Sequence, residues 1–249
     1  MNKHVRIGRF LRQRRILLAV SVLVTAMASH ADGYTTGNLL TDPSFEANPL
    51  INFVDILTPP FTTNAWGAES ATISGPADGI TPADGSLMLR MTDDGLIATQ
   101  AWQLIDVSAY SVDINAGLVT VDASALYNVP ADILSGVSSL NIQFLDASHA
   151  TIGLGVNVGS STLDSNVATW ESLNITSAPL PAGTQYLRTQ LAYGNASMQS
   201  NGVSRPGYVD ATHLTLTAVP EPSTLILATS ALLAPLLRRK STVMGEFAF

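Results

Sequence analysis

The middle of the chain alternates apolar and polar residues with a period of two, the spacing that places side chains on opposite faces of a β-strand. In residues 139–147, for example, Leu140, Ile142 and Phe144 are apolar and the residues between them are polar. The same alternation recurs in four further segments, 86–92, 118–127, 185–193 and 212–218. Each segment predicts a strand with one buried face and one solvated face.

Turn sequences rich in Gly, Pro, Asp and Asn separate these segments. They are ADG at 83–85, DDG at 93–95, NAG at 115–117 and PAG at 181–183. Between residue 31 and the C-terminal tail there is no long helical periodicity, and neither an internal repeat nor a low-complexity linker divides the region. Short strands joined by regular turns predict an all-β domain over residues 32–218, an antiparallel β-sandwich of the jelly-roll type.

The N-terminal segment has a different pattern, that of a secretory signal peptide over residues 1–28. A basic stretch precedes the apolar run ILLAVSVLVTAM, which predicts a signal helix. The small residues Ala26 and Ala28 then fit a cleavage site after Ala28, with Ala31 as the second choice. The alternative is a retained N-terminal membrane anchor.

The C-terminal segment 219–240 (VPEPSTLILATSALLAPLLRRK) predicts a short hydrophobic helix over residues 224–237. Counted from Ser223, the apolar run has 15 residues, fewer than the roughly 20 that cross a bilayer as a helix. The cations that follow would stay on the cytoplasmic side of the membrane. A signal peptide and a weak membrane anchor together predict that the middle of the chain is exported.

The parts of this tail, in their order, resemble the PEP-CTERM sorting signal. The residues that carry the resemblance are Pro220, Glu221 and Pro222, the apolar helix, and the cluster Arg238, Arg239 and Lys240. The resemblance implies processing by an exosortase-type enzyme, a transient anchor in the inner membrane, and a Gram-negative host that makes extracellular polysaccharide. Residues 241–249 extend beyond the usual end of such a signal.

Charge changes the picture because it is unevenly distributed. Of 12 Lys and Arg residues, nine lie in the two terminal segments, so three arginines face 17 acids in residues 29–219, a net charge of −14 there. Such a charge excludes nucleic acid as a partner and favours cations. The chain has no cysteine, which excludes disulfides and thiolate metal sites.

A second resemblance concerns the predicted domain, whose motifs are similar to the galactose-binding-like jelly roll of many carbohydrate-binding modules. The motifs are NLLTDPSFE at 38–46, DGSLMLR at 84–90, FLD at 144–146 and YVD at 208–210. The resemblance implies one structural Ca²⁺ held by Glu46 and Asp210, and carboxylates are suitable calcium ligands. The alternative is that Glu46 only accepts backbone N–H groups at a strand corner.

Sugar binding in such domains uses an aromatic ring beside polar side chains. Trp66 and the tyrosines Tyr193 and Tyr208, which flank the polar loop 194–207, are the candidate ligand-binding residues. Trp102 and Trp170 are assigned to the core.

Catalysis has no comparable signal. Of the histidines, His149 and His213 lie in the predicted domain, and the sequence identifies no Ser or Cys partner for either. The sequence therefore predicts a non-enzymatic, exported surface or extracellular-matrix protein with a carbohydrate-binding-like domain that contacts extracellular polysaccharide. The alternatives are a purely structural matrix or surface component without a sugar site, and a glycan hydrolase built on a β-sandwich.

Overall fold

The computed structural model describes residues 33–47, 50–52, 63–92, 99–133, 136–160, 163–194 and 205–219. The predicted signal helix, the C-terminal apolar helix and residues 241–249 lie outside these ranges. Within them, no helix has the length and apolar character that a membrane span requires. Residues 34–218 form one compact unit.

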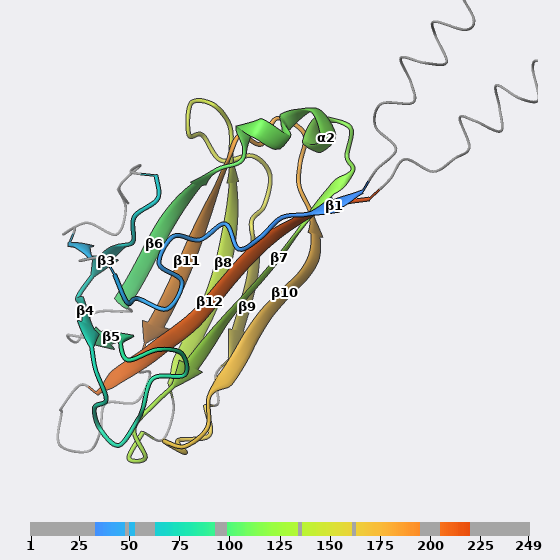
Figure 1. The fold of residues 1–249 in the computed structure, drawn as a ribbon. Coiled ribbons are helices and arrows are strands. Elements are labelled where there is room, and N and C mark those ends of the chain that lie inside the picture. The colour runs from blue at the N-terminus through green and yellow to red at the C-terminus, as the bar shows by residue number, and fades with distance from the viewer. Residues whose placement is uncertain are drawn as a thin grey trace, which may run out of the picture. The chain divides into compact units, whose positions relative to one another are not determined.

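The described residues are mainly strands (Figure 1). In chain order the strands are β1 (Tyr34–Thr35), β2 (Ile51–Asn52), β3 (Gly67–Glu69), β4 (Ala71–Ser74), β5 (Met88–Thr92), β6 (Thr99–Asp106), β7 (Val119–Asn128), β8 (Val137–Leu145), β9 (Val156–Ser160), β10 (Glu171–Pro179), β11 (Tyr186–Gly194) and β12 (Pro206–Ala218). A 3₁₀ turn (Ser108–Tyr110) and the short helix α2 (Ser111–Asn115) connect β6 to β7.

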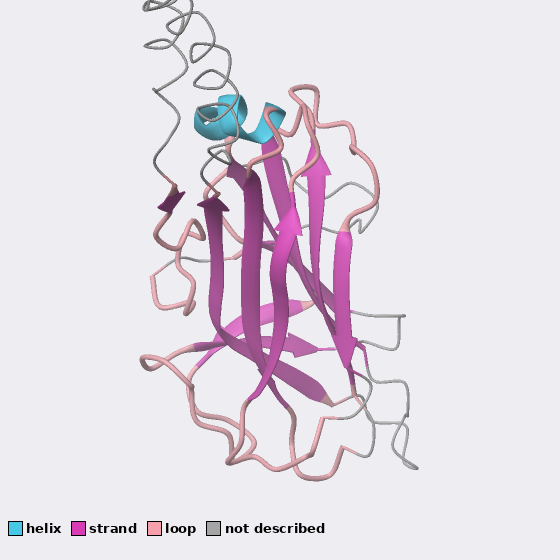
Figure 2. Ribbon diagram, turned by 90° about the vertical axis from the view of Figure 1, so that its right-hand side faces the viewer, coloured by secondary structure: helices cyan, strands magenta, loops and turns pink. Residues whose placement is uncertain are grey.

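The strands form two sheets that pack face to face, as Figure 2 shows. Sheet A has the order β10-β7-β12-β5-β4, with β1 also paired to β12, and sheet B has the order β2-β3-β6-β11-β8-β9. The pairings are antiparallel except for the short β2–β3 pair. The predicted antiparallel β-sandwich is confirmed.

The core lies between the sheets and follows from the alternation in the sequence. Along β7 every second residue from Val119 to Tyr127 is buried, and the residues between are partly exposed. Strand β8 on the opposite sheet shows the same pattern around Leu140 and Ile142. The hydroxyl of Tyr127 donates a hydrogen bond of 2.7 Å to the backbone carbonyl of Ser139, which ties sheet A to sheet B.

The N-terminal segment follows strand β12 from its C-terminal end to its middle. After β1 pairs with the end of β12, Leu39 N donates to Leu214 O, and Thr212 N donates to Pro43 O. These bonds place the residues after Pro43 beside the middle of β12, where β12 has an irregular register.

Candidate functional site

Glu46 lies across the turn that precedes β5. Its Oε1 accepts the backbone N–H groups of Ser86 (2.8 Å) and Leu87 (2.6 Å), and its Oε2 accepts the Ser86 hydroxyl (2.8 Å). These donors, the Leu87 N–H first, lower the pKa of Glu46. Gly85 adopts a φ of +69°, and a Cβ there would come within 2.5 Å of Oε1, so only glycine fits under the carboxylate.

Asp210 holds the same turn from the other side. Its Oδ2 accepts the N–H groups of Ala83 (2.7 Å) and Asp84 (3.0 Å), and its Oδ1 accepts that of Ala211 (2.7 Å). The side chain is fully buried, and this burial raises the pKa of Asp210 despite the three donors.

The structure thus brings the two predicted metal ligands to one turn, and both accept hydrogen bonds there. This is the non-metal role considered as the alternative for Glu46. No group of three or more side chains of the metal-ligating types occurs among the described residues, so a Ca²⁺ held here would need backbone carbonyl oxygens as well. Calcium remains a prediction whose donor set is compatible with the ion.

The three aromatic residues expected to contact a ligand are all interior. Trp66 is 3% exposed, packs against Phe45 at 5.4 Å between ring centroids, and donates from Nε1 to Asp42 O. Tyr193 points into the core from β11, and Tyr208 is buried with its hydroxyl on Asp78. The expectation of a solvent-facing stacking platform at these positions is therefore corrected.

Tyr208 is buried for a reason that the strand pattern does not reveal. It points away from the inter-sheet core, yet a second small cluster with Ile80 and Met88 covers it. Trp170 packs against this cluster and donates from Nε1 to Thr81 O. Side chains of the loop after β4 thus cover Tyr208 at one end of sheet A.

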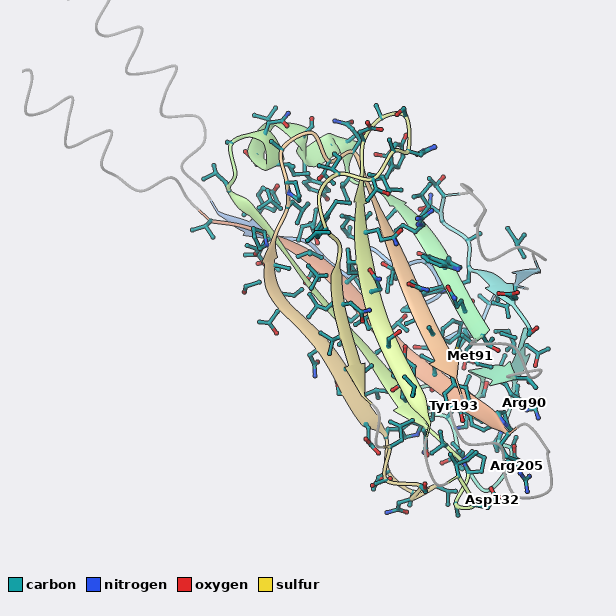
Figure 3. All side chains as sticks on the ribbon, turned by 180° about the vertical axis from the view of Figure 1, so that it is seen from behind. Arg90, Met91, Asp132, Tyr193 and Arg205 are labelled. Carbon is teal, nitrogen blue, oxygen red and sulfur yellow. The ribbon has the colours of Figure 1, made fainter. Side chains whose placement is uncertain are left out.

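The loop 194–207, expected to carry a ligand, is described only at its two ends; residues 195–204 lie outside the described ranges. Figure 3 shows Tyr193 beside the C-terminal end of this loop, where Arg205 forms an ion pair with Asp132.

A polar surface that sequence reasoning did not assign to a site lies on the outer side of sheet B. We call it the polar face of sheet B, and it consists of Gln100, Trp102, Asn141, Gln143, Arg188 and Gln190. The strand register aligns these residues: Trp102 pairs with Gln190, which pairs with Asn141, while Arg188 pairs with Gln143.

Arg188 is the centre of the polar face. Its Nε donates to Gln143 Oε1 at 2.8 Å, its Nη2 donates to the same oxygen, and its Cζ lies 5.0 Å from the centroid of the Trp102 ring. The guanidinium is half-buried, which lowers the pKa of Arg188. A second amide pair, Gln190 with Gln100, extends the polar row along the sheet.

Two buried polar atoms on this face have no hydrogen-bond partner among the described residues: Trp102 Nε1, a donor, and Asn141 Oδ1, an acceptor. Unpartnered buried polar atoms are uncommon in folded proteins, and each calls for an explanation such as a bound water, an ion or a functional role. Trp102 had been assigned to the core together with Leu104. Both side chains are buried but lie on the outer side of sheet B. The alternation in the sequence cannot show this, because seven of the eight residues of β6 are buried.

Comparison with known families adds a finding at the C-terminus. Residues 218–241 match the model of the PEP-CTERM protein-sorting motif. The chain carries a PEP-CTERM sorting motif. The PEP-CTERM motif confirms the predicted signal at 219–240 and marks an exported protein that is sorted through processing at a membrane. It begins at Ala218, the last residue of β12.

Solved structures resemble the domain at low identity. A family 61 carbohydrate-binding module (TmCBM61), solved in complex with β-1,4-galactotriose, shares 14% identity at a TM-score of 0.43, covering 72% of this chain and 98% of its own. The C-terminal family 22 carbohydrate-binding module of Clostridium thermocellum Xyn10B shares 15% identity at a TM-score of 0.41, covering 63% of this chain and 86% of its own. The CBM22-1 xylan-binding domain of Paenibacillus barcinonensis Xyn10C shares 14% identity at a TM-score of 0.39, covering 77% of this chain and 99% of its own. No protein of curated function matches the sequence. At these values the resemblance is one of β-sandwich architecture and says nothing of a ligand.

Proposed function

We propose that this exported protein is a non-enzymatic component of the cell surface or extracellular matrix of a Gram-negative bacterium, and that its β-sandwich binds polysaccharide through the polar face of sheet B. The observation that carries the proposal is the contact of Arg188 with Gln143 and Trp102. Beside it, Trp102 Nε1 and Asn141 Oδ1 are buried without a partner among the described residues. Export is supported independently by the PEP-CTERM motif.

The polar face has the chemistry that recognition of a sugar chain needs. Sugar hydroxyls both donate and accept, and amide side chains such as Gln143, Asn141 and Gln190 supply both functions. These side chains come from adjacent central strands of sheet B, so their spacing is set by the sheet rather than by loops. A row of such groups along a sheet suits an extended polymer.

A purely structural component without a sugar site is the second candidate. The observation in its favour is the burial of Trp66, Tyr193 and Tyr208, which removes the expected aromatic platforms. The non-enzymatic part of the proposal is supported by the sequence, which identifies no Ser or Cys partner for His149 or His213.

The binding proposal predicts that a glycan array probed with the protein yields specific hits. Gln143→Ala should weaken them roughly fivefold, because it removes a net hydrogen bond of about 1 kcal/mol. Asn174→Ala, which deletes an exposed amide from β10 on the other sheet, is the matched control and should leave binding unchanged. An array without hits, or equal losses from both variants, favours the structural candidate.

We further propose that Glu46 and Asp210 hold one Ca²⁺ together with carbonyl oxygens of the 83–87 turn. If so, EDTA should lower the thermal midpoint by several degrees, since an ion at 100 times its Kd contributes about 2.7 kcal/mol. Glu46→Gln should lose this sensitivity to EDTA. An unchanged midpoint on chelation would exclude a structural ion and leave the two carboxylates as hydrogen-bond acceptors.

The sorting proposal predicts that an exosortase-type enzyme removes the residues that follow the Pro220–Pro222 triplet. Proline fixes φ and disfavours a helical residue before it, so the sequence favours an extended segment that a processing enzyme can reach. Mass spectrometry of the surface fraction from the native host should find a C-terminus near this triplet, and Glu221→Ala should accumulate as a longer species. An intact C-terminus on the surface protein would overturn the prediction.

A further inference from the structure

Among the described residues, no anionic partner of Arg188 occurs. Its two hydrogen bonds to described residues both go to one neutral amide oxygen, that of Gln143. The ion pair found among the described residues is that of Arg205 with Asp132, elsewhere on the molecule. A half-buried charge without a counter-ion is unfavourable, because burial removes water and nothing of opposite sign replaces it.

Two described acids share this face, Asp106 on β6 and Glu69 on β3, and neither forms an ion pair with Arg188. Arg188 pairs with Leu104 on β6, so Trp102 and Asp106 are the diagonal neighbours on the same face. The guanidinium leans over the Trp102 ring, whereas Asp106 accepts the backbone N–H of Ser108 with its Oδ1. Arg188 and Asp106 are therefore close in the strand register, but their charged groups contact different partners.

A second donor without an acceptor adjoins the first. Trp102 Nε1–H is buried, is without a partner among the described residues, and belongs to the ring that Arg188 covers. Arg188 uses two of its N–H groups on a single oxygen, and a guanidinium has five. The group is therefore rich in donors and positive, and the ligand atoms that would complete it are acceptors with negative charge.

We propose that Arg188, with Trp102, binds a carboxylate of an acidic sugar, so that the polysaccharide ligand is a uronic-acid polymer. This inference rests on the proposed function, because it specifies the polymer that the polar face of sheet B binds. A carboxylate presents two oxygens in one plane, which match the fork of the guanidinium. The −14 charge of residues 29–219 opposes a polyanion at long range, but screening over about 8 Å at physiological salt confines the decisive interaction to this contact.

The test compares one polymer in two charge states. Polygalacturonate and its fully methyl-esterified form share a backbone, and the ester lacks the negative charge. Affinity electrophoresis and calorimetry use the full exported chain in neutral detergent, in calcium-free buffer at 0.15 M salt. The proposal expects the acid form to bind at least roughly tenfold more tightly than the ester, as for one charge-assisted contact.

Four variants locate the charge effect. Arg188→Gln should abolish the preference for the acid form, and Arg188→Lys should retain only part of it. Arg205→Gln removes the same formal charge from a distant ion pair and should retain the full preference. Gln143→Glu places a carboxylate where the amide oxygen contacts Arg188, so it should remove the preference while preserving the fold.

The outcomes separate the inference from the proposed function. If the ester or a neutral galactan binds as tightly as the acid polymer, the face binds sugar but the acidic ligand is wrong. If the preference for the acid form persists in both Arg188→Gln and Gln143→Glu, another group recognises the carboxylate of the polymer and the inference is overturned. If no glycan on the array binds either, the proposed function fails with it.

Discussion

Asp210→Ala is expected to lower the free energy of unfolding by about 3 kcal/mol, because three backbone N–H groups lose a charged acceptor inside the protein. The donors belong to Ala83, Asp84 and Ala211, so the loss affects both the turn before β5 and the irregular point of β12. Domains of this size have stabilities of roughly 5–15 kcal/mol, so the effect is a large fraction of the total.

Urea denaturation in the presence of EDTA measures this loss without any contribution from a bound ion. Asp210→Asn keeps the volume and one carbonyl oxygen, and it should cost about half as much or less. Asp106→Ala is the matched control, since this exposed aspartate accepts the single N–H of Ser108. If Asp210→Ala and Asp106→Ala unfold at the same urea concentration, the turn does not depend on the buried carboxylate.

Gly207→Ala is expected to destabilise the domain by a similar amount, about 3 kcal/mol or roughly 10 °C in the thermal midpoint, through overpacking. A Cβ at Gly207 would lie 2.5 Å from Cδ2 of the Tyr193 ring, closer than any van der Waals contact allows. The ring is fully buried and cannot move towards solvent. Gly136 also leaves the ring little room, because a Cβ there would come 3.0 Å from Cε2 of Tyr193.

Calorimetric melting of four variants, Gly207→Ala, Gly37→Ala, Tyr193→Ala and the double variant, tests this packing. Gly37→Ala adds the same methyl group where nothing lies within 4 Å, and it should melt within about a degree of the natural protein. In the double variant Gly207→Ala with Tyr193→Ala, the total loss should be smaller than the sum of the single losses, since the clash is gone. Additive losses would show that the two residues do not press on one another.

The interior position of Tyr193 also explains why a plausible aromatic was a poor candidate for a ligand. Figure 3 places Tyr193 near Met91 at the end of the sandwich away from α2, and both side chains are fully buried. In this acidic, aromatic-poor domain the large rings fill the core. Recognition is then left to the amides and the arginine on the outside of sheet B.

The polar face illustrates where sequence reasoning was insufficient. The alternation around Leu187 and Leu191 predicted that Arg188 and Gln190 face away from the core, and the structure shows them there. It did not predict that Trp102 joins them, because β6 is buried on both sides. Which side of such a strand faces outward depends on its register with β11, and register is a property of the assembled sheet.

The sequence by itself determined the β-sandwich and the sorting motif, and it singled out Glu46 and Asp210, although only the structure shows that both hold the 83–87 turn. It could do so because alternation, a linear motif and a short signature are all local in the chain. Only the tertiary structure decided that Trp66, Tyr193 and Tyr208 are interior, and that Arg188 lies over Trp102 with no anionic partner among the described residues. Burial and charge pairing depend on which distant strands meet, and those contacts form only when the two sheets close around the core.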